Sequence, residues 1–281
     1  NQLQSTAAAA ERVFELIEEE EEVDLDKKPA FSMEPSEVKG EIEFEHVNFG
    51  YSDDEIIIND FSFKAEPGQR IAIVGPTGAG KTTIVKLLMR FYEVNSGHIR
   101  VDGHDIKEFS RENLRRMFGM VLQDTWLNSG TVRENIRYGK PDATDEEVEE
   151  AAKAAHIHHF IKTQSKGYDM EINEEANNIS QGQKQLLTIA RAILADTPIM
   201  ILDEATSSVD TRTEALIQQA MANLTENRTS FIIAHRLSTI RDADHILVMN
   251  HGDIVEQGTH ESLLAENGFY ARLYNSQFAG Q

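Results

Sequence analysis

The feature that constrains this chain most is the stretch Gly75-Pro76-Thr77-Gly78-Ala79-Gly80-Lys81-Thr82, which fits the pattern G-x-x-x-x-G-K-[ST]. The apolar run 70–74 before it predicts a buried strand, and residues 82–91 after it predict a helix. Glycines let a backbone wrap closely around an anion, and the amide N–H groups of such a loop converge on phosphate oxygens. A helix that starts there adds a positive partial charge. The stretch therefore predicts a phosphate-binding loop.

Two side chains give this loop a more specific chemistry. Lys81 can place a positive charge on the β- and γ-phosphates of a nucleoside triphosphate, and the Thr82 hydroxyl is expected to bind Mg²⁺. The alternative is a glycine-rich turn that matches by chance, and the strand and helix on either side argue against it. The residues expected to contact the nucleotide here are Gly75, Thr77, Gly78, Ala79, Gly80, Lys81, Thr82 and Thr83.

Composition narrows the class of partner. The formal net charge of −21, from 48 acidic and 27 basic residues, argues against a nucleic-acid backbone, because such a backbone binds basic surfaces. The sequence has no cysteine, which excludes disulfide and thiolate chemistry and fits the cytoplasm. No apolar run approaches the roughly 18 residues that span a bilayer, and no signal peptide is visible. Because the first residue is Asn1, we expect either a fragment of a longer protein or a processed chain.

Residues 1–39 differ from the rest of the chain. Apolar side chains recur there at helical spacing, and the acidic run Glu18–Glu22 and two prolines follow. We expect a marginal helix with a solvated acidic linker; a sharper interpretation is a helix that continues an upstream segment. The apolar stripe consists of Leu3, Ala7, Ala10, Phe14 and Ile17. Residues 40–281 form the second region.

Strands and helices alternate from residue 41 onward. Helix starts are expected at two capping boxes, Thr131-x-x-Glu134 and Thr144-x-x-Glu147, and again after Ser180. An irregularity is expected near His46, and a break near Gly268 in the last helix. Strands alternating with helices imply an α/β core with parallel strands. The predicted strands are 42–51, 56–65, 70–74, 97–103, 120–122, 199–204 and 230–234, and a closing hairpin is expected from 246–249 and 254–255 with a turn at Gly252. The segment 131–165 is expected to be mostly helical, and further helices are 181–195, 260–278 and one that carries Leu216, Ile217, Ala220, Met221 and Leu224 in phase.

An apolar strand ending in two carboxylates narrows the chemistry. Asp203 is placed to hold Mg²⁺, and Glu204 can accept a proton from an attacking water. The alternative is an acidic pair that caps the next helix. Ser180-Gln181-Gly182-Gln183 is a third feature, because a hydroxyl and several N–H groups at a helix start make an anion site. Alone this signal is weak, since most serines at such a position are ordinary caps.

Several other side chains are not assigned a role. Trp126 and Tyr168 are expected to pack, and residues 111–116 are expected to present their arginines on a solvated helix face. His156, His158 and His159 lack a second cluster of ligands, which argues against a metal site.

These residues together resemble the ATP-binding cassette (ABC) ATPases, from about Glu41 to Leu273. The motifs stand in the family's order, and the phrases 202–207, 235–239 and 258–261 are similar to its exporter branch. The resemblance implies a P-loop NTPase core with a mostly parallel sheet, an antiparallel β subdomain and an α-helical subdomain at about 125–178. The matches are Gly75–Thr82 (Walker A), Gln123 (Q-loop), Ile179-Ser180-Gln181-Gly182-Gln183 (signature), Ile199–Glu204 (Walker B), Ser207-Ser208-Val209-Asp210 (D-loop), His235 (switch histidine) and Tyr51 (stacking on adenine).

The resemblance also implies a mechanism and partners. Two cassettes pack head to tail with ATP between them, and Ser180 and its neighbours close over the γ-phosphate held by the other chain's Walker A motif. Glu204 polarises water, His235 contacts the γ-phosphate, and Gln123 senses Mg²⁺ and the membrane domain. The implied enzyme is an ATPase that drives export, on the cytoplasmic face of the cell membrane. A helix like residues 1–17 is then the tail of the last membrane-spanning helix of the same polypeptide.

One departure from the family pattern concerns the partner. The family usually has Leu-Ser-Gly-Gly-Gln where this chain has Ile179-Ser180-Gln181-Gly182-Gln183. A glutamine side chain can hinder the close approach that glycine allows, so the signature offered to the partner is expected to be weakened. We therefore expect a heterodimer, and the alternative is a tolerated variant in a homodimer.

Two other functions are weighed against the exporter. A soluble ABC ATPase acting on ribosomes or DNA usually carries two cassettes or a long coiled-coil insert, and the stretch from Gln123 to Ser180 leaves no room for one. A regulatory subunit that binds nucleotide without turnover is opposed by the presence of both Glu204 and His235.

Overall fold

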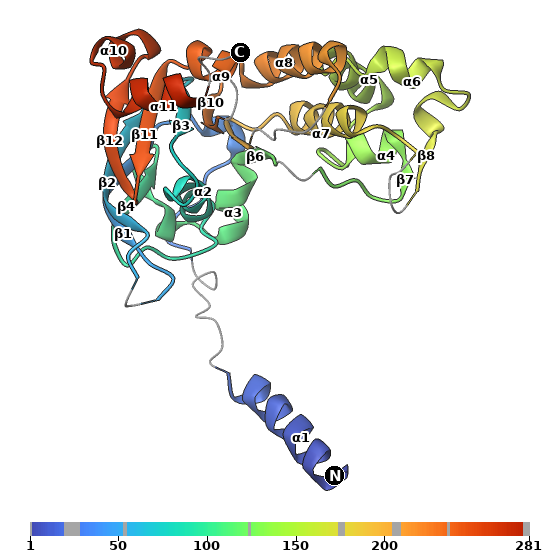
Figure 1. Cartoon of the computed structure of the whole chain (residues 1–281). Helices are drawn as coiled ribbons and strands as arrows, with labels where there is room; N and C mark the ends of the chain where they lie inside the picture. Colours follow the sequence, from blue (N-terminus) through green and yellow to red (C-terminus); the bar gives the residue numbers. More distant parts are fainter. Residues whose placement is uncertain are drawn as a thin grey trace.

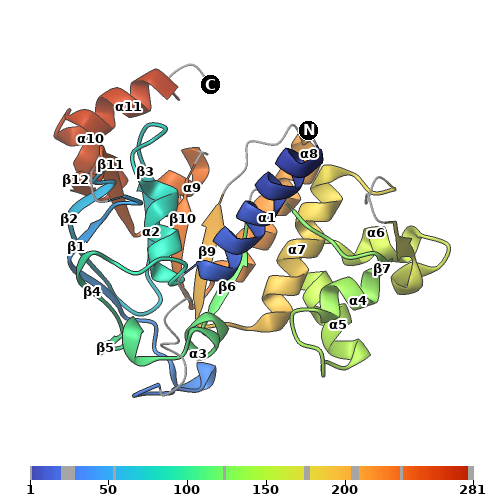
Figure 2. The same ribbon diagram turned by 90° about the horizontal axis from the view of Figure 1, so that it is seen from below.

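The computed structural model describes residues 2–19, 29–52, 55–122, 125–173, 178–203, 209–234 and 237–277. The described chain contains an antiparallel sheet, a mostly parallel sheet, a helical part and a separate N-terminal helix (Figure 1, Figure 2). This arrangement agrees with the predicted α/β fold.

The antiparallel sheet has the strand order β2-β1-β4-β5. The register between β1 and β2 slips between Phe44 and Val47, where His46 has a φ of 48°, and this confirms the predicted irregularity. Phe44 packs edge-on against Phe61, with ring centroids 5.1 Å apart, and against Phe231 of the second sheet at 6.3 Å. These aromatic contacts join the two sheets in one core. The strands are β1 (Ile42–Phe49), β2 (Ile58–Ala65), β4 (Ser96–Val101) and β5 (His104–Asp105).

The central sheet has the strand order β12-β11-β3-β10-β9-β6, and all neighbouring pairs are parallel except β11 and β12. Ile233 of β10 lies opposite both Ile73 of β3 and Asp203 of β9. The carboxyl ends of these three strands therefore form one edge of the sheet. The strands are β3 (Arg70–Val74), β6 (Phe118–Val121), β9 (Ile199–Asp203), β10 (Thr229–Ile233), β11 (His245–Asn250) and β12 (Asp253–Gly258).

Helices cover both faces of this sheet, as expected for parallel strands joined by crossovers. Helix α2 (Lys81–Leu88) packs in the same apolar cluster as Ile201, whereas α7 (Gln181–Ala195) packs in the cluster of Met200 and Leu202. Successive residues of a strand point to opposite faces, so α2 and α7 cover opposite faces of β9. Figure 2 shows the two helices on different sides of these strands.

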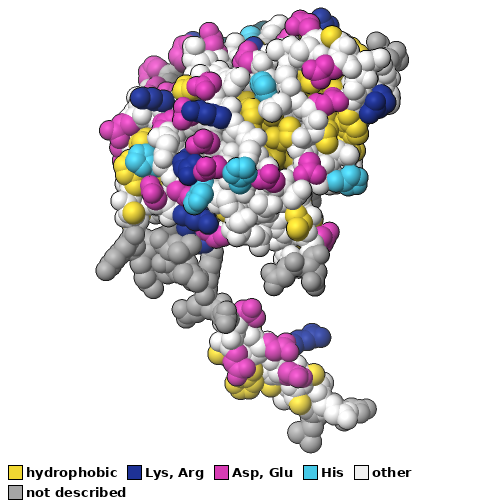
Figure 3. Space-filling view, turned by 90° about the vertical axis from the view of Figure 1, so that its left-hand side faces the viewer, with side chains coloured by type: hydrophobic (Ala, Val, Ile, Leu, Met, Phe, Trp, Pro, Cys, Tyr) yellow, Lys and Arg dark blue, Asp and Glu magenta, His cyan; other side chains and the backbone are white. Residues whose placement is uncertain are grey.

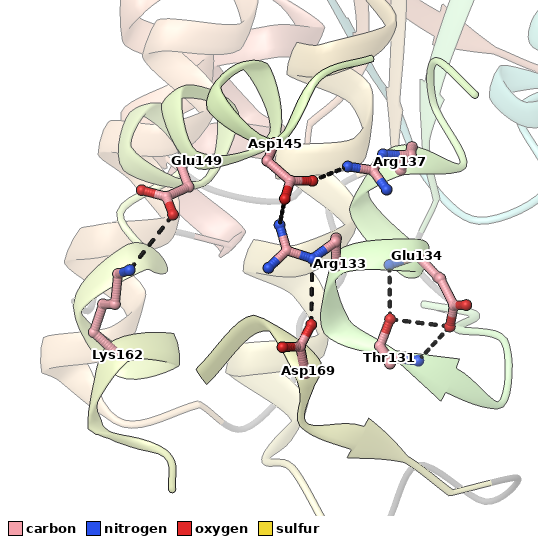
Figure 4. A network of polar contacts seen from close by, with 8 residues as sticks. All are labelled: Thr131, Arg133, Glu134, Arg137, Asp145, Glu149, Lys162 and Asp169. Carbon is pink, nitrogen blue, oxygen red and sulfur yellow. Dashed lines mark hydrogen bonds and ion pairs between the residues drawn. The ribbon is translucent and has the colours of Figure 1, made fainter. Parts of the chain in front are cut away.

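The helical part is built around α7. Both predicted capping boxes are present, because Thr131 and Glu134, and likewise Thr144 and Glu147, bond reciprocally at their helix starts. Arg133 bridges Asp145 at 2.9 Å and Asp169 at 3.3 Å, as Figure 4 shows. The helices are α4 (Val132–Arg137), α5 (Asp145–Ala154), α6 (His158–Thr163) and α8 (Thr211–Thr225), with the short strands β7 (Gly130–Thr131) and β8 (Glu171–Ile172).

The C-terminal helices pack on the face of β3 and β11 that carries Ala72 and Val248, opposite the face covered by α2. The chain breaks between two helices at Gly268, as predicted, and the Glu256 carboxylate accepts hydrogen bonds from the N–H groups of Phe269 and Tyr270. These helices are α9 (Leu237–Asp242), α10 (His260–Ala265) and α11 (Phe269–Gln277). The remaining elements are α3 (Arg111–Arg116) and the short 3₁₀ helices η1 (Pro35–Glu37), η2 (Ile106–Glu108) and η3 (Gly167–Asp169).

Helix α1 (Gln2–Glu18) stands apart from the rest of the chain, and its apolar side chains are exposed (Figure 1, Figure 3). The exposed residues include Val13, Phe14, Leu16 and Ile17. Within the described ranges, no helix combines the length and the apolar character that crossing a bilayer requires.

Two expectations about single side chains were wrong. Trp126 does not pack but is 63% exposed. Arg115 is not on a solvated face, because its guanidinium donates to the carbonyl groups of Met89 and Arg90 at 3.2 and 3.1 Å. Tyr168 is buried, as expected, and its hydroxyl lies 2.8 Å from His158 Nδ1.

Candidate nucleotide-binding site

The phosphate-binding loop runs from β3 into α2 at the carboxyl edge of the central sheet. Gly80 is the residue before the helix and has a φ of 95°, a conformation that favours glycine. A Cβ on Gly75 would lie 2.2 Å from the Met249 carbonyl oxygen, so the loop passes too close to β11 for a side chain. The Gly252 N–H donates to the Ala79 carbonyl at 3.1 Å and fastens the loop to the β11–β12 turn. The loop is therefore held in shape by its own chain.

The Lys81 ammonium folds back over this loop. Its Nζ donates to the carbonyl oxygens of Gly75 and Pro76 at 2.8 and 2.9 Å. Burial lowers the pKa of Lys81, and the Asp203 carboxylate acts in the opposite direction. The structure therefore brings Lys81 and Asp203 close enough for their charges to interact.

The first turn of α2 is open toward the same region. Thr82 is exposed and Thr83 is buried, while Thr77 and Gly78 are exposed at the tip of the loop. The first N–H groups of any helix have no partner within the helix, so they can bind an anion. An ammonium, a loop of amides and a hydroxyl thus lie together.

Tyr51 stands beside this helix turn. Its hydroxyl lies 3.4 Å from Thr83 Oγ1, and its ring packs edge-on against Phe49 and Tyr92 at 5.0 and 5.1 Å. Lys86 Nζ lies 5.6 Å from the ring centroid. Tyr51 remains 48% exposed, which leaves ring surface for a base to stack on. Tyr92 and Lys86 were not predicted, because their contact with Tyr51 joins residues far apart in the sequence.

The site suits Mg²⁺ with few protein ligands. Magnesium prefers oxygen ligands and usually keeps several waters, with one or two carboxylates and substrate phosphates completing its shell. The Thr82 hydroxyl and the Asp203 carboxylate fit this requirement at the sheet edge. Among the described residues, no three His, Asp or Glu side chains gather as a metal-binding group. Gln123, Glu204 and His235 lie outside the described residues.

The signature forms the start of α7. The Ser180 hydroxyl accepts a hydrogen bond from the Gln183 N–H at 3.3 Å, and the Gln183 side chain accepts one from the Ser180 N–H at 2.8 Å. Gln181 is exposed, and its Nε2 donates to Thr125 Oγ1 at 3.1 Å. A Cβ on Gly182 would lie 2.4 Å from a methyl carbon of Thr213, so this glycine allows α7 to contact the start of α8.

Asp210, predicted in the D-loop, caps α8 beside this contact. Its carboxylate accepts a hydrogen bond from the Thr213 N–H at 3.0 Å, and the hydrogen bonds from Thr213 lower the pKa of Asp210. Ser207 and Ser208 lie outside the described residues. The structure thus gathers the signature and Asp210 in one place, and the phosphate loop, Tyr51 and Asp203 in another.

Comparison with known proteins agrees with this geometry. The family model described as "ABC transporter" matches residues 58–207. A fatty acid ABC transporter ATP-binding/permease protein of Mycobacterium tuberculosis is 58% identical over 273 residues, which cover 97% of this chain and 42% of the relative. The ATP-binding cassette sub-family B member 6 of Xenopus tropicalis is 48% identical over 279 residues, covering 99% of this chain and 32% of that protein.

A solved structure of a bacterial Atm1-family ABC exporter with ATP bound is also similar. Its TM-score is 0.84 at 41% sequence identity, covering 98% of this chain and 48% of the exporter chain. The chain therefore spans less than half the length of the relatives it matches. Because the family model covers more than half of the chain, the chain belongs to the ABC transporter family, as an ATP-binding domain.

Proposed function

We propose that this chain binds and hydrolyses Mg-ATP and thereby drives export across a membrane. The main observation behind the proposal is that Lys81 and Asp203 lie near each other at one sheet edge, beside a loop of backbone amides. A triphosphate needs a cationic donor and backbone N–H groups, and its metal needs a carboxylate.

Each residue has a proposed part in the reaction. The Lys81 ammonium exchanges the carbonyl groups of Gly75 and Pro76 for phosphate oxygens, and Tyr51 stacks on the adenine. Mg²⁺, held by Thr82, Asp203 and Gln123, would neutralise charge on the β- and γ-phosphates. Glu204 takes a proton as water attacks the γ-phosphorus and the bond to the bridging oxygen breaks, which leaves ADP and phosphate.

A second cassette is proposed to complete the site. Helices α2 and α7 cover opposite faces of β9, which favours a signature that serves a nucleotide held by another cassette. Because Gln181 replaces the glycine that the family usually has in the signature, we propose that the partner cassette is a different chain, which makes a heterodimer. The Gln181 side chain donates to Thr125 of its own chain, and the alternative partner is a second copy of this chain. An ATPase rate that is high and second order in this chain alone would contradict the heterodimer.

The site assignment is tested by two substitutions. Glu204→Gln is expected to lower turnover by about 10²- to 10⁴-fold while ATP binding is retained, because only the proton acceptor is lost. Lys81→Ala is expected to weaken ATP binding itself. Lys153→Ala is a matched control, because this lysine pairs with Glu150 in the helical part. Full turnover in Glu204→Gln would show that the base is assigned wrongly.

The membrane part of the proposal rests on α1. Its exposed apolar residues are proposed to continue the last membrane-spanning helix of the same polypeptide, at the cytoplasmic face of the membrane. Six apolar spans in the gene upstream of residue 1 would support this, and a soluble upstream domain would contradict it. Fatty acids are the first substrate class to test in vesicles that contain the full-length protein, because the Mycobacterium relative is named for them.

A further inference from the structure

Helix α7 forms hydrogen bonds at two points with the segment that follows β6, here Thr125 and Trp126. Gln181 Nε2 donates to Thr125 Oγ1 at 3.1 Å near the start of the helix, and Arg191 Nη1 donates to the Trp126 carbonyl at 3.1 Å farther along. Thr125 comes four residues after Val121, the last residue of β6. Helix α7 is therefore bonded to Thr125 and Trp126, the first described residues after Leu122.

The two attachments differ in strength. Arg191 is held from several sides, because it also donates to the carbonyl and side-chain oxygens of Asn135 at 2.9 and 3.1 Å and lies 5.1 Å from the Tyr138 ring centroid. Gln181 reaches Thr125 through one neutral hydrogen bond between an exposed and a half-buried side chain. The Arg191 attachment combines several contacts, whereas the Gln181 attachment is one hydrogen bond that can form or break at small cost.

The weaker bond lies between the proposed nucleotide site and the signature, so it can connect the two. Val121 lies opposite Leu202, the residue before Asp203, so β6 ends beside the proposed Mg-ATP edge, four residues before Thr125. Gln181 stands directly between Ser180, which caps α7, and Gly182, which packs on Thr213. A glycine at position 181 could not make this bond, because it has no side-chain donor.

We infer that Gln181 is a positioning residue that links nucleotide bound at this chain's phosphate loop to the signature that the chain offers its partner. The link is the side-chain bond to Thr125, which ties the start of α7 to the segment leaving β6. The inference deepens the proposed function and rests on it, because it requires ATP at the P-loop.

The test measures hydrogen exchange at the first turn of α7. The Glu204→Gln chain is used at a concentration where sedimentation shows a monomer, with and without Mg-ATP. In this parent chain, ATP is expected to change exchange of the Gln183 and Lys184 amides by about 2- to 10-fold, the range set by one neutral hydrogen bond. Gln181→Ala and Thr125→Val should abolish the change, and their combination should do no more.

Two controls separate positioning from folding. Thr125→Ser keeps the hydroxyl and should preserve the response, and Gln164→Ala removes a side-chain amide that bonds Phe160 elsewhere in the helical part. Trp126 is the chain's one tryptophan, so its quenching by acrylamide reports the segment directly. Quenching without nucleotide should rise in both Gln181→Ala and Thr125→Val.

The outcomes are distinguishable through ATP binding, measured separately by equilibrium dialysis. If ATP binds and Gln181→Ala or Thr125→Val keeps the exchange response, the inference is overturned and the proposed function stands. The inference is also overturned, and the proposed function stands, if ATP binds the parent chain without changing hydrogen exchange in α7. If ATP does not bind the parent chain, the proposed function fails and the inference fails with it.

Discussion

At the scale of single residues, the Lys81 ammonium has a pKa that burial lowers. Phosphate anions favour the charged lysine, so its pKa is higher in the ATP complex than in the free protein. Affinity should be fully present below the free protein's pKa and should fall as pH rises through it, by at most about tenfold per pH unit. Calorimetric Kd values between about pH 7 and pH 10 test this. Lys81→Arg should bind more weakly but with a flat profile, since guanidinium stays charged; equal slopes would contradict the assignment.

Tyr51 allows a second prediction at this scale. Tyr51→Ala should weaken ATP binding by about 1–3 kcal/mol, because the stacking surface is lost. Tyr51→Phe keeps the ring, and the hydroxyl contacts with Thr83 and Lys86 are long, at 3.4 and 3.5 Å. Its Kd should therefore stay near that of the unmodified chain. An equal loss in both variants would show that the hydroxyl, not the ring, binds the nucleotide.

The sequence allowed some of these residues to be predicted and not others. Lys81 and Thr82 were predictable, because the chemistry of the loop depends on adjacent residues. The exposure of Trp126 and the buried contacts of Arg115 were not, because they depend on chain segments brought together by folding. The bond from Gln181 to Thr125 crosses 56 positions of sequence and has no local signal.

At the scale of elements, α7 contacts the start of α8 through Gly182. An alanine Cβ there would lie 2.4 Å from Thr213 Cγ2, and overpacking of this kind costs about 1–3 kcal/mol. The better helix propensity of alanine offsets at most about 1 kcal/mol, so Gly182→Ala should lower the free energy of unfolding. Urea unfolding measures the change. Adding Thr213→Ser removes the clashing methyl and should restore part of the loss; no recovery would place the strain elsewhere.

Element boundaries were predictable where caps mark them. The helix predicted at 181–195 is observed as Gln181–Ala195, because Ser180 and Gln183 form a local capping box. The strand order β12-β11-β3-β10-β9-β6 was not predictable. Strand pairing depends on contacts between distant residues, and the apolar runs of β3, β9 and β10 are too similar to specify their neighbours.

At the scale of the whole molecule, the separation of α2 from α7 leads to a prediction about Ser180. Ser180→Asp keeps a residue that caps helices well but adds a negative charge at the signature. If the signature serves the partner's nucleotide, this charge repels a triphosphate held by the other cassette. The isolated monomeric chain should then bind ATP within about twofold of the unmodified Kd, since the phosphate loop lies on the other face of the sheet.

Turnover by the assembled full-length transporter should respond differently. Ser180→Asp should abolish it, whereas the neutral cap Ser180→Asn should reduce it less, because only the first variant adds charge. Equilibrium dialysis on the monomer and phosphate release by the transporter measure the two effects separately. If Ser180→Asp weakened ATP binding by the monomer as strongly as Lys81→Ala does, the signature and the phosphate loop would act on the same nucleotide within one chain. The need for a second cassette would then disappear.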